Sequence, residues 1–326
     1  MNRNKCMMAV ILAVFLTVAG CAHTEAEHKE TDFSEREDAV WQRILESSGQ
    51  DQQVDTFSHE LCVIYGGEAG PDSQVEAEAA AVFSLDSQKV VLQKNAMERL
   101  YPASMTKVLT ALVAIRYGNL SDVVTVGEEA VITEAGASLC KINPGDTLTL
   151  EQLLYGLMLP SGNDAGAAIA VHISGSIEAF SDLMNAEAHR LGATDTHFTN
   201  PHGLHDENHY TTAYDLYLIF QEALKEPVFR SLIGTPSYTA RYTDPDGNPK
   251  EQTWKNSNKY INGDVAMPEG LLAIGGKTGT TNAAGSCLIM GSLDQEQHEY
   301  ISIIMKSANR NQLYDEMTNI IQKVVN

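Results

Sequence analysis

Strand-forming segments lie at both ends of the region that begins near residue 77, and helix-forming segments lie between them. The first two, AAAVFSLD (79–86) and KVVLQKN (89–95), are separated by a two-residue turn, which predicts a β-hairpin. Apolar runs near the C-terminal end predict three more strands, at 271–276, 286–293 and 300–306. We expect both ends of this region to share one sheet, with the helical middle inserted between them. Two lobes with a cleft between them follow from that order.

Apolar residues at helical spacing predict a helix over 101–118, where Pro102 fits the first turn and Gly118 fits the end. Thr149 and Gln152 form a possible capping box at the start of a second helix. The other helices are predicted at 150–158, 163–173, 177–191, 212–225 and 309–325. The predicted fold class is therefore α/β of the α+β kind, an antiparallel sheet flanked by helices with an inserted, mainly helical lobe.

The N-terminus resembles a bacterial lipoprotein signal sequence. Arg3 and Lys5 precede an apolar run over 7–19, which is too short for a comfortable membrane span and suits a secretory signal. The run ends at a Val-Ala-Gly-Cys21 sequence like a lipobox, in which cleavage would leave a diacylated cysteine. An ordinary signal peptide with a chance cysteine is the alternative. Acyl chains on Cys21 would place the chain outside the cytoplasm, anchored to the bacterial cell membrane.

The chain is predicted to have three regions. Residues 1–20 are the signal peptide, the acid-rich segment 21–72 is a tether after the lipidated cysteine, and 73–326 is the folded domain. The formal net charge is −21. A surface this acidic repels nucleic acid, so a nucleic-acid partner is excluded.

Three cysteines remain in the body of the chain, namely Cys62, Cys140 and Cys287. An odd number excludes a full disulfide framework, and one bridge or three isolated buried thiols are both open. Because no C-x-x-C pair is present, a cysteine zinc site has no support.

Three short motifs carry possible chemistry: Ser104-Met-Thr-Lys107, Ser161-Gly-Asn163 and Lys277-Thr278-Gly279. Each is weak alone, because S-x-x-K recurs at Ser138 to Lys141 and S-x-N recurs at Ser307 to Asn309.

Context favours Ser104 as the nucleophile. Ser104 opens a predicted helix, so Lys107 would lie one turn away on the same face. The second S-x-x-K leads directly into the turn-forming segment 142–146, where the two side chains need not meet. A serine needs an adjacent base, and a lysine becomes one when burial and a nearby cation such as Lys277 lower its pKa. A helix N-terminus adds N–H groups for a developing oxyanion.

The order S-x-x-K, S-x-N, K-T-G, with the flanking strings PASMTK, LLYGLMLPSGNDA, THFTNPHGL, HYTTAYDL and GGKTGTTNAAGSC, resembles the low-molecular-mass serine D-alanyl-D-alanine carboxypeptidases. These belong to the superfamily of penicillin-binding proteins and serine β-lactamases. The resemblance covers about residues 77–326 and implies a β-lactamase/transpeptidase-like fold, with 73–326 as the catalytic domain. Many such proteins carry a further C-terminal β-rich domain and membrane helix. Here 47 residues follow Gly279, and a lipid on Cys21 would replace that anchor.

The resemblance also implies roles for single residues. Ser104 attacks the carbonyl of the penultimate D-Ala, Lys107 takes its proton, and Ser161 relays a proton to the leaving amine. Asn163 holds the substrate amide and orients Lys107. The terminal carboxylate is received along Lys277, Thr278, Gly279 and Thr280, and the N–H groups of Ser104 and Thr280 form the oxyanion hole. The expected partners are peptidoglycan stem peptides ending in D-Ala-D-Ala and β-lactams as covalent inhibitors, with no metal or organic cofactor.

Several alternatives stay open on the sequence. An endopeptidase that cuts peptide cross-links would use the same residues. A class A β-lactamase would need a Glu-x-x-Leu-Asn loop, which is absent after Ser161. A non-catalytic β-lactam sensor would not need every catalytic position filled. A histidine cluster at 197, 202, 205 and 209 suggests zinc by spacing, but loop-fixing histidines are the preferred interpretation.

Overall fold

The computed structural model describes residues 61–64 and 75–324. The chain divides into Met1–Thr56 and Phe57–Asn326, and all described residues belong to the second unit. The predicted signal peptide, Cys21 and most of the predicted tether lie outside the described residues. Cys62, within the tether range, is fully buried, and its backbone is held by the hydroxyls of Tyr217 (2.9 Å) and Tyr214 (3.0 Å).

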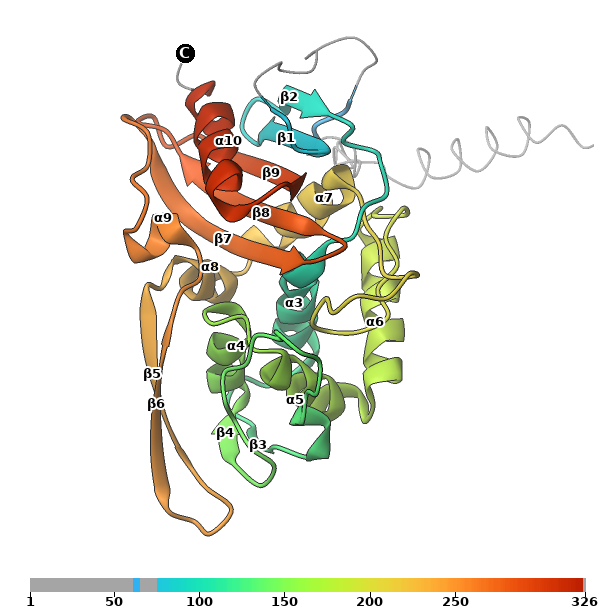
Figure 1. The fold of residues 1–326 in the computed structure, drawn as a ribbon, viewed down its shortest axis with the longest axis vertical. Coiled ribbons are helices and arrows are strands. Elements are labelled where there is room, and N and C mark those ends of the chain that lie inside the picture. The colour runs from blue at the N-terminus through green and yellow to red at the C-terminus, as the bar shows by residue number, and fades with distance from the viewer. Residues whose placement is uncertain (1–60, 65–74, 325–326) are drawn as a thin grey trace, which may run out of the picture. The chain divides into compact units, whose positions relative to one another are not determined.

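One five-stranded antiparallel sheet joins the two ends of the described body, as predicted (Figure 1). Its order is β2-β1-β9-β8-β7. The strands are β1 Ala79–Ser84, β2 Lys89–Lys94, β7 Leu272–Thr281, β8 Gly285–Leu293 and β9 Glu299–Ser307. Because β1 pairs with both β2 and β9, the N-terminal hairpin and the C-terminal strands fold as one unit.

The helical middle supplies the second lobe. Its main helices are α3 Lys107–Tyr117, α4 Leu150–Met158, α5 Asn163–Ser174, α6 Ile177–Arg190 and α7 Ala213–Leu224. The capping box predicted at Thr149 and Gln152 is present in both directions. A final helix, α10 Arg310–Gln322, packs on β8 and β9 across the sheet face (Figure 1).

The predicted helix over 101–118 needs a correction at its start. Its first turn is a 3-10 helix, η2 Ala103–Thr106, and the α-helix begins only at Lys107. The cause is local backbone geometry, since Ala103 has a φ of 48°. Ser104 therefore lies in the 3-10 turn rather than in the α-helix. Gly118 does end the helix, but in an extended conformation.

A second, four-stranded sheet was not predicted. Its order is β3-β4-β5-β6, formed by β3 Val123–Thr125, β4 Thr147–Thr149, β5 Ser237–Thr243 and β6 Pro249–Lys255. The hairpin β5–β6 is largely exposed and rich in Thr, Lys and Glu, so it lacks the apolar runs that mark buried strands. The available signal was the turn sequence Asp-Pro-Asp-Gly at 244–247 between two segments that carry Thr and aromatic residues. The short elements η3 Glu128–Ala130, α8 Pro227–Gly234 and α9 Lys259–Asn262 were also not predicted.

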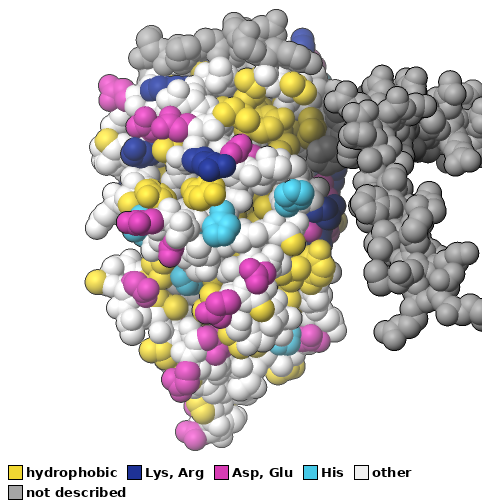
Figure 2. Space-filling model, turned by 90° about the vertical axis from the view of Figure 1, so that its right-hand side faces the viewer, with side chains coloured by type: hydrophobic (Ala, Val, Ile, Leu, Met, Phe, Trp, Pro, Cys, Tyr) yellow, Lys and Arg dark blue, Asp and Glu magenta, His cyan; other side chains and the backbone are white. Residues whose placement is uncertain are grey.

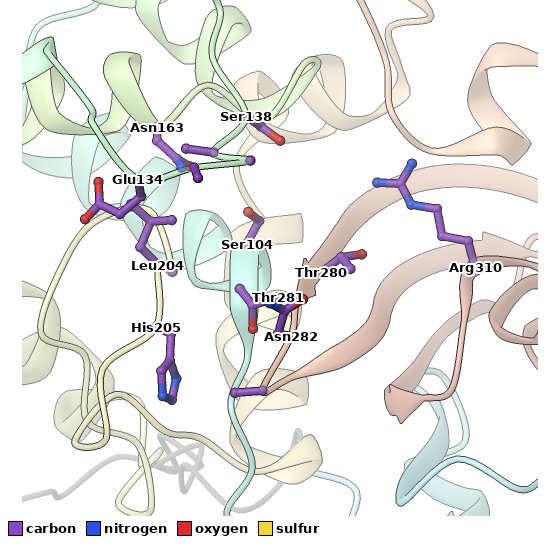
Figure 3. A pocket seen from close by; sticks show the side chains of 15 residues that line it. Ser104, Glu134, Ser138, Asn163, Leu204, His205, Thr280, Thr281, Asn282 and Arg310 are labelled. Atoms are coloured by element: carbon purple, nitrogen blue, oxygen red, sulfur yellow. The ribbon is translucent and has the colours of Figure 1, made fainter.

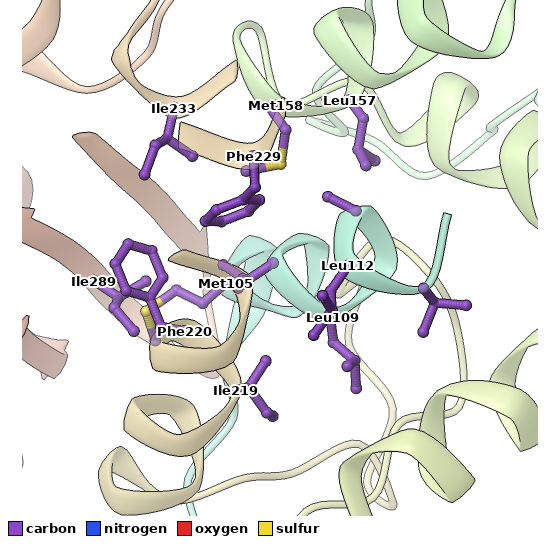
Figure 4. Close-up of a cluster of buried hydrophobic side chains, with 14 of the residues drawn as sticks. Met105, Leu109, Leu112, Leu157, Met158, Ile219, Phe220, Phe229, Ile233 and Ile289 are labelled. Atoms are coloured by element: carbon purple, nitrogen blue, oxygen red, sulfur yellow. The ribbon is translucent and has the colours of Figure 1, made fainter. Parts of the chain in front are cut away.

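Helix α3 lies at the centre of the main core (Figure 4). From Val108 to Ala114 its apolar side chains, together with Met105, are fully buried against side chains from α4, α7, α8 and β8, among them Leu157, Phe220, Phe229 and Ile289. Fully burying one such side chain contributes about 1.5–3 kcal/mol. This packing fixes the helix that carries Lys107 against both lobes.

The three body cysteines are free and buried, which confirms isolated thiols over a bridge. Figure 2 shows acidic side chains scattered over both halves of one face, with basic ones mainly in the upper half. Within residues 61–64 and 75–324, no helix has the length and apolar character needed to span a bilayer.

An ion-pair network around the buried carboxylate of Glu187 joins three helices of the helical lobe. Arg116, at the end of α3, donates to Glu187 of α6 at 2.5 Å and also to Glu222 of α7. Arg190 donates to the same Glu187 carboxylate at 2.8 Å. The side chain of Glu187 is 1% exposed, and its hydrogen bonds to Arg190 and Arg116 lower its pKa from 4.5 to about 2.

We expect Glu187→Gln to lower the free energy of unfolding at pH 7 by about 2–3 kcal/mol, because both arginines lose a buried carboxylate. Because the pKa of Glu187 is lower in the folded state, its carboxylate stabilises the fold fully above pH 4.5. This stabilisation is lost progressively as the pH falls toward 2. The difference between variant and native protein should therefore shrink over that interval. Urea denaturation at several pH values measures it, with Asp182→Asn, an exposed acid on α6, as the control. An equal, pH-independent loss in both variants would contradict this account.

Candidate active site

Ser104 lines a cleft of about 570 Å³ (Figure 3). The walls come from distant parts of the chain: Ser138 and Asn163 from the helical lobe, Leu204 and His205 from the loop before α7, Thr280 from β7, and Arg310 from the start of α10. Figure 3 places Ser104 between Asn163 and Ser138 on one side and Thr280 on the other. The cleft between two lobes is thus present where the sequence predicted it.

Two glycines allow other backbone segments to approach the turn that carries Ser104. A Cβ added at Gly203, whose φ is +83°, would lie 1.9 Å from the carbonyl oxygen of Ala103. A Cβ added at Gly279 would lie 3.0 Å from the amide nitrogen of Ser104. Glycine is therefore required at Gly203, and at Gly279 it keeps β7 against the Ser104 backbone.

Lys107 is fully buried and bonded to three groups. Its Nζ lies 3.0 Å from Ser104 Oγ, 2.6 Å from Asn163 Oδ1 and 2.6 Å from the carbonyl oxygen of His202. Burial, followed by the charge of Lys277, lowers the pKa of Lys107 well below its usual value. A neutral amine has two N–H groups and one lone pair. Asn163 Oδ1 and the His202 carbonyl can only accept, so the lone pair of the neutral amine faces the Ser104 hydroxyl.

Ser161 and Lys277 form a second pair beside the first. Lys277 Nζ donates to Ser161 Oγ at 3.0 Å and to the carbonyl of Thr278 at 2.9 Å. Burial, followed by the charge of Arg310, lowers the pKa of Lys277 to about 7. Ser161 has a φ of 66°, a left-handed conformation that is costly for a non-glycine residue. That conformation directs its hydroxyl to β7.

The K-T-G segment lies within β7 and pairs with β8 through Ile289, Leu288 and Cys287. Lys277 and Thr278 are buried, and Thr280 lines the cleft. Thr278 Oγ1 lies 2.9 Å from Ser257 Oγ, which comes from the segment before α9.

His202 and His209, from the cluster noted in the sequence, make hydrogen bonds to neighbouring protein groups. His209 Nε2 lies 2.7 Å from Thr106 Oγ1, and His209 Nδ1 accepts from the amide of Thr199 at 3.0 Å. Nε2 therefore carries the proton and donates to the threonine. Burial lowers the pKa of both His202 and His209 to about 3, so both are neutral. Within the described residues, no group of three or more His, Cys, Asp or Glu is placed to hold a metal ion.

The structure does not make the second S-x-x-K a catalytic pair. Ser138 and Lys141 lie on a loop whose amides at Cys140 and Lys141 donate to the Asp164 carboxylate (2.9 and 2.8 Å). Ser307 is buried in β9, and the Asn309 side chain caps α10 by accepting from the amides of Asn311 and Gln312. Asp164 thus braces this loop.

Sequence reasoning missed three side chains of this region: Glu134 and Arg310, which line the cleft, and Ser257, which contacts Thr278. Glu134 lies in an unpatterned loop, and Arg310 begins a helix 33 residues after Lys277. Neither belongs to a recognisable motif, because only the folded chain brings them to the cleft. For Ser257, the polar cluster Asn-Ser-Asn at 256–258 was the available signal.

Comparison with known proteins agrees with this geometry. The family of D-alanyl-D-alanine carboxypeptidases, peptidase S11, matches residues 67–309. The chain is 36% identical over 239 residues to D-alanyl-D-alanine carboxypeptidase DacF of Bacillus subtilis, covering 72% of this chain and 58% of that protein. It is 39% identical over 210 residues to DacB2 of Mycobacterium tuberculosis, covering 64% and 67%.

The solved structure of the Streptomyces K15 DD-transpeptidase is also similar, with a TM-score of 0.72 and 29% identity. The alignment covers 78% of this chain and 98% of that one. The chain spans less than two thirds of the length of Bacillus subtilis DacF and Escherichia coli DacA, namely 58% and 56%. Because the family match covers most of the chain and the relatives agree with it, the chain belongs to the D-alanyl-D-alanine carboxypeptidase family, peptidase S11.

Proposed function

We propose that this chain is a serine D-alanyl-D-alanine carboxypeptidase that removes the terminal D-Ala from peptidoglycan stem pentapeptides. The observation that carries the proposal is the contact of the fully buried Lys107 amine with the Ser104 hydroxyl, 3.0 Å from Nζ to Oγ. Family membership and the names of its relatives support the same activity.

The residues around Ser104 fit an acyl-enzyme mechanism. Ser104 Oγ attacks the carbonyl carbon of the penultimate D-Ala while its proton passes to neutral Lys107. The C–N bond to the terminal D-Ala then breaks, and Ser161, bonded to Lys277, delivers a proton to the leaving amine. Asn163 holds Lys107 through Oδ1, which leaves its amide NH₂ for the substrate. Water hydrolyses the acyl-enzyme in the second half of the reaction.

The terminal carboxylate has a cationic site on the β7 side of the cleft. Lys277 and Thr278 lie on β7, with Thr280 and Arg310 in the cleft wall. Amides at Ser104 and Thr280 are the proposed oxyanion donors, supported by the close packing of Gly279 on the Ser104 amide. β-Lactams carry a carboxylate and a reactive carbonyl in a similar relation, so we propose that they acylate Ser104.

Cross-link endopeptidase activity is a second candidate, since the same catalytic residues serve it. Arg310, at the end of the cleft proposed for the terminal carboxylate, favours a substrate with a free C-terminus and therefore the carboxypeptidase. The residues of a class A deacylating loop are not matched in sequence, and a sensor would have no use for the intact lysine pairs.

We further propose that Cys21 is lipidated and that the catalytic domain acts outside the cytoplasm, held to the membrane by that lipid. The apolar run before Cys21 supports this proposal. Residues 21–72 would then serve as a tether for the domain at 73–326.

Replacing Ser104 by Ala should abolish release of D-Ala from a peptide ending in Lys-D-Ala-D-Ala, by at least about 10³-fold in kcat. Ser138→Ala is the matched control. It should retain most of the activity, because Ser138 and Lys141, the residues of the second S-x-x-K, lie on a loop and not at the start of a helix. Acylation by a fluorescent penicillin should be lost only in the first variant. Labelling without D-Ala release in the native protein would leave the site intact and point to cross-links as the substrate.

Lys277→Gln should move the pH dependence of acylation as well as slow it. Removing this cation raises the pKa of Lys107, so the acidic limb of the profile should shift to higher pH. The acylation rate should also fall by about 10²-fold or more, because Ser161 loses its partner. Lys255→Gln, an exposed lysine on β6, should leave rate and profile unchanged. A slower variant with an unshifted limb would show that Lys277 does not tune Lys107.

Cys21→Ala should release the protein from the membrane fraction of its bacterial host and abolish incorporation of labelled palmitate. Cys62→Ala, a cysteine of the folded body, should change neither result. Palmitate incorporation that survives Cys21→Ala would refute the lipobox assignment.

A further inference from the structure

The cleft has opposite charges at its two ends (Figure 3). Arg310 and Thr280 lie to one side of Ser104, while Glu134, Leu204 and His205 lie to the other. If the terminal carboxylate occupies the cationic end, the residue that precedes D-Ala-D-Ala must extend toward Glu134. That direction follows from the chain order of the substrate once its scissile carbonyl is placed at Ser104.

The Glu134 carboxylate is available to a ligand. Within the described part of the chain it forms no ion pair and accepts no hydrogen bond, although its backbone carbonyl accepts from the amide of Ala137 at 3.1 Å. Nearby Glu129 differs, since its carboxylate accepts from the amide of Gly127 at 2.9 Å. Glu134 is thus an exposed anion in the cleft wall with no internal counter-charge.

The loop that carries Glu134 is anchored to the helix that carries Asn163. The amide of Asn163 donates to the carbonyl of Ser138 at 2.8 Å, and the Asp164 carboxylate accepts from the amides of Cys140 and Lys141. These bonds begin four residues after Glu134. They hold its loop in fixed relation to Lys107, which Asn163 also binds.

We infer that Glu134 is a specificity-determining residue that attracts an ammonium group on the side chain of the residue before D-Ala-D-Ala. The substrate class is then a peptide with a diamino acid at that position, of which lysine is the simplest. Half-buried Leu204 lines the cleft on the same side of Ser104 as Glu134 and provides an apolar wall for the methylene stem of such a side chain. This inference rests on the proposed function, because that function sets the direction of the peptide.

The test compares two peptides that differ by one charge, Nα-acetyl-Lys-D-Ala-D-Ala and its Nα,Nε-diacetyl form. The native protein should prefer the free amine by about three- to tenfold in kcat/KM, the range expected of a partly exposed ion pair. Glu134→Gln should bring the ratio close to one, mainly through KM for the free amine. The control Glu128→Gln removes an exposed charge from η3, outside the cleft lining, and should keep the native ratio.

Two results would overturn the inference: a native protein that does not distinguish the peptides, or a Glu134→Gln variant that keeps the native preference. Acylation of that variant by benzylpenicillin at the native rate shows that Ser104 and Lys107 are intact. If penicillin acylates the native protein but neither peptide releases D-Ala, the proposed function fails on its own. The charge preference is then measured from acylation by a penicillin with an ammonium-bearing side chain and by its N-acetyl derivative, where equal rates reject a role for Glu134.

Discussion

The whole site depends on the burial of one amine, that of Lys107. A charged ammonium fully removed from water is costly, so burial itself favours the neutral form that can act as a base. Three parts of the chain meet at this atom: the turn of Ser104, the start of α5 through Asn163, and the loop at His202. Placing such a group in the interior requires the surrounding helices to pack closely, and α3 is accordingly the helix around which the main core forms.

Two of the described non-glycine residues with positive φ lie at the serines of the site. Ala103, directly before Ser104, and Ser161 both have positive φ, a conformation that costs on the order of 1–3 kcal/mol for a non-glycine residue. Surrounding contacts hold the first of these turns: Thr106 donates to the Ala103 carbonyl at 2.9 Å, and His209 donates to Thr106. His209, one of the four histidines whose spacing suggested a metal, therefore supports the turn that carries Ser104.

The sequence predicted the elements whose apolar pattern is strong and missed those defined by tertiary contact. The five strands of the main sheet and the principal helices follow from periodicity, and the three motifs converge on one cleft as expected. The hairpin β5–β6 was not predicted because its side chains are mostly exposed. The 3-10 turn at Ser104 was not predicted because tertiary packing, rather than intrinsic helix propensity, determines it. Glu134 and Arg310 had no motif, since their relation to Ser104 exists only in the folded chain.

The adjacent residues Asn163 and Asp164 show how a neutral group comes to lie beside Lys107 in this acidic protein. A carboxylate beside Lys107 would stabilise the ammonium and raise its pKa, which would remove the base. The neutral amide of Asn163 occupies that position, while Asp164 turns away and accepts from the amides of Cys140, Lys141 and Ile142. Lys277 likewise has no carboxylate among its hydrogen-bond partners, which are the hydroxyl of Ser161 and the carbonyl of Thr278. Burial therefore lowers the pKa of both lysines, and neutral hydrogen-bond partners avoid the opposing effect of a bonded carboxylate in a chain with a net charge of −21.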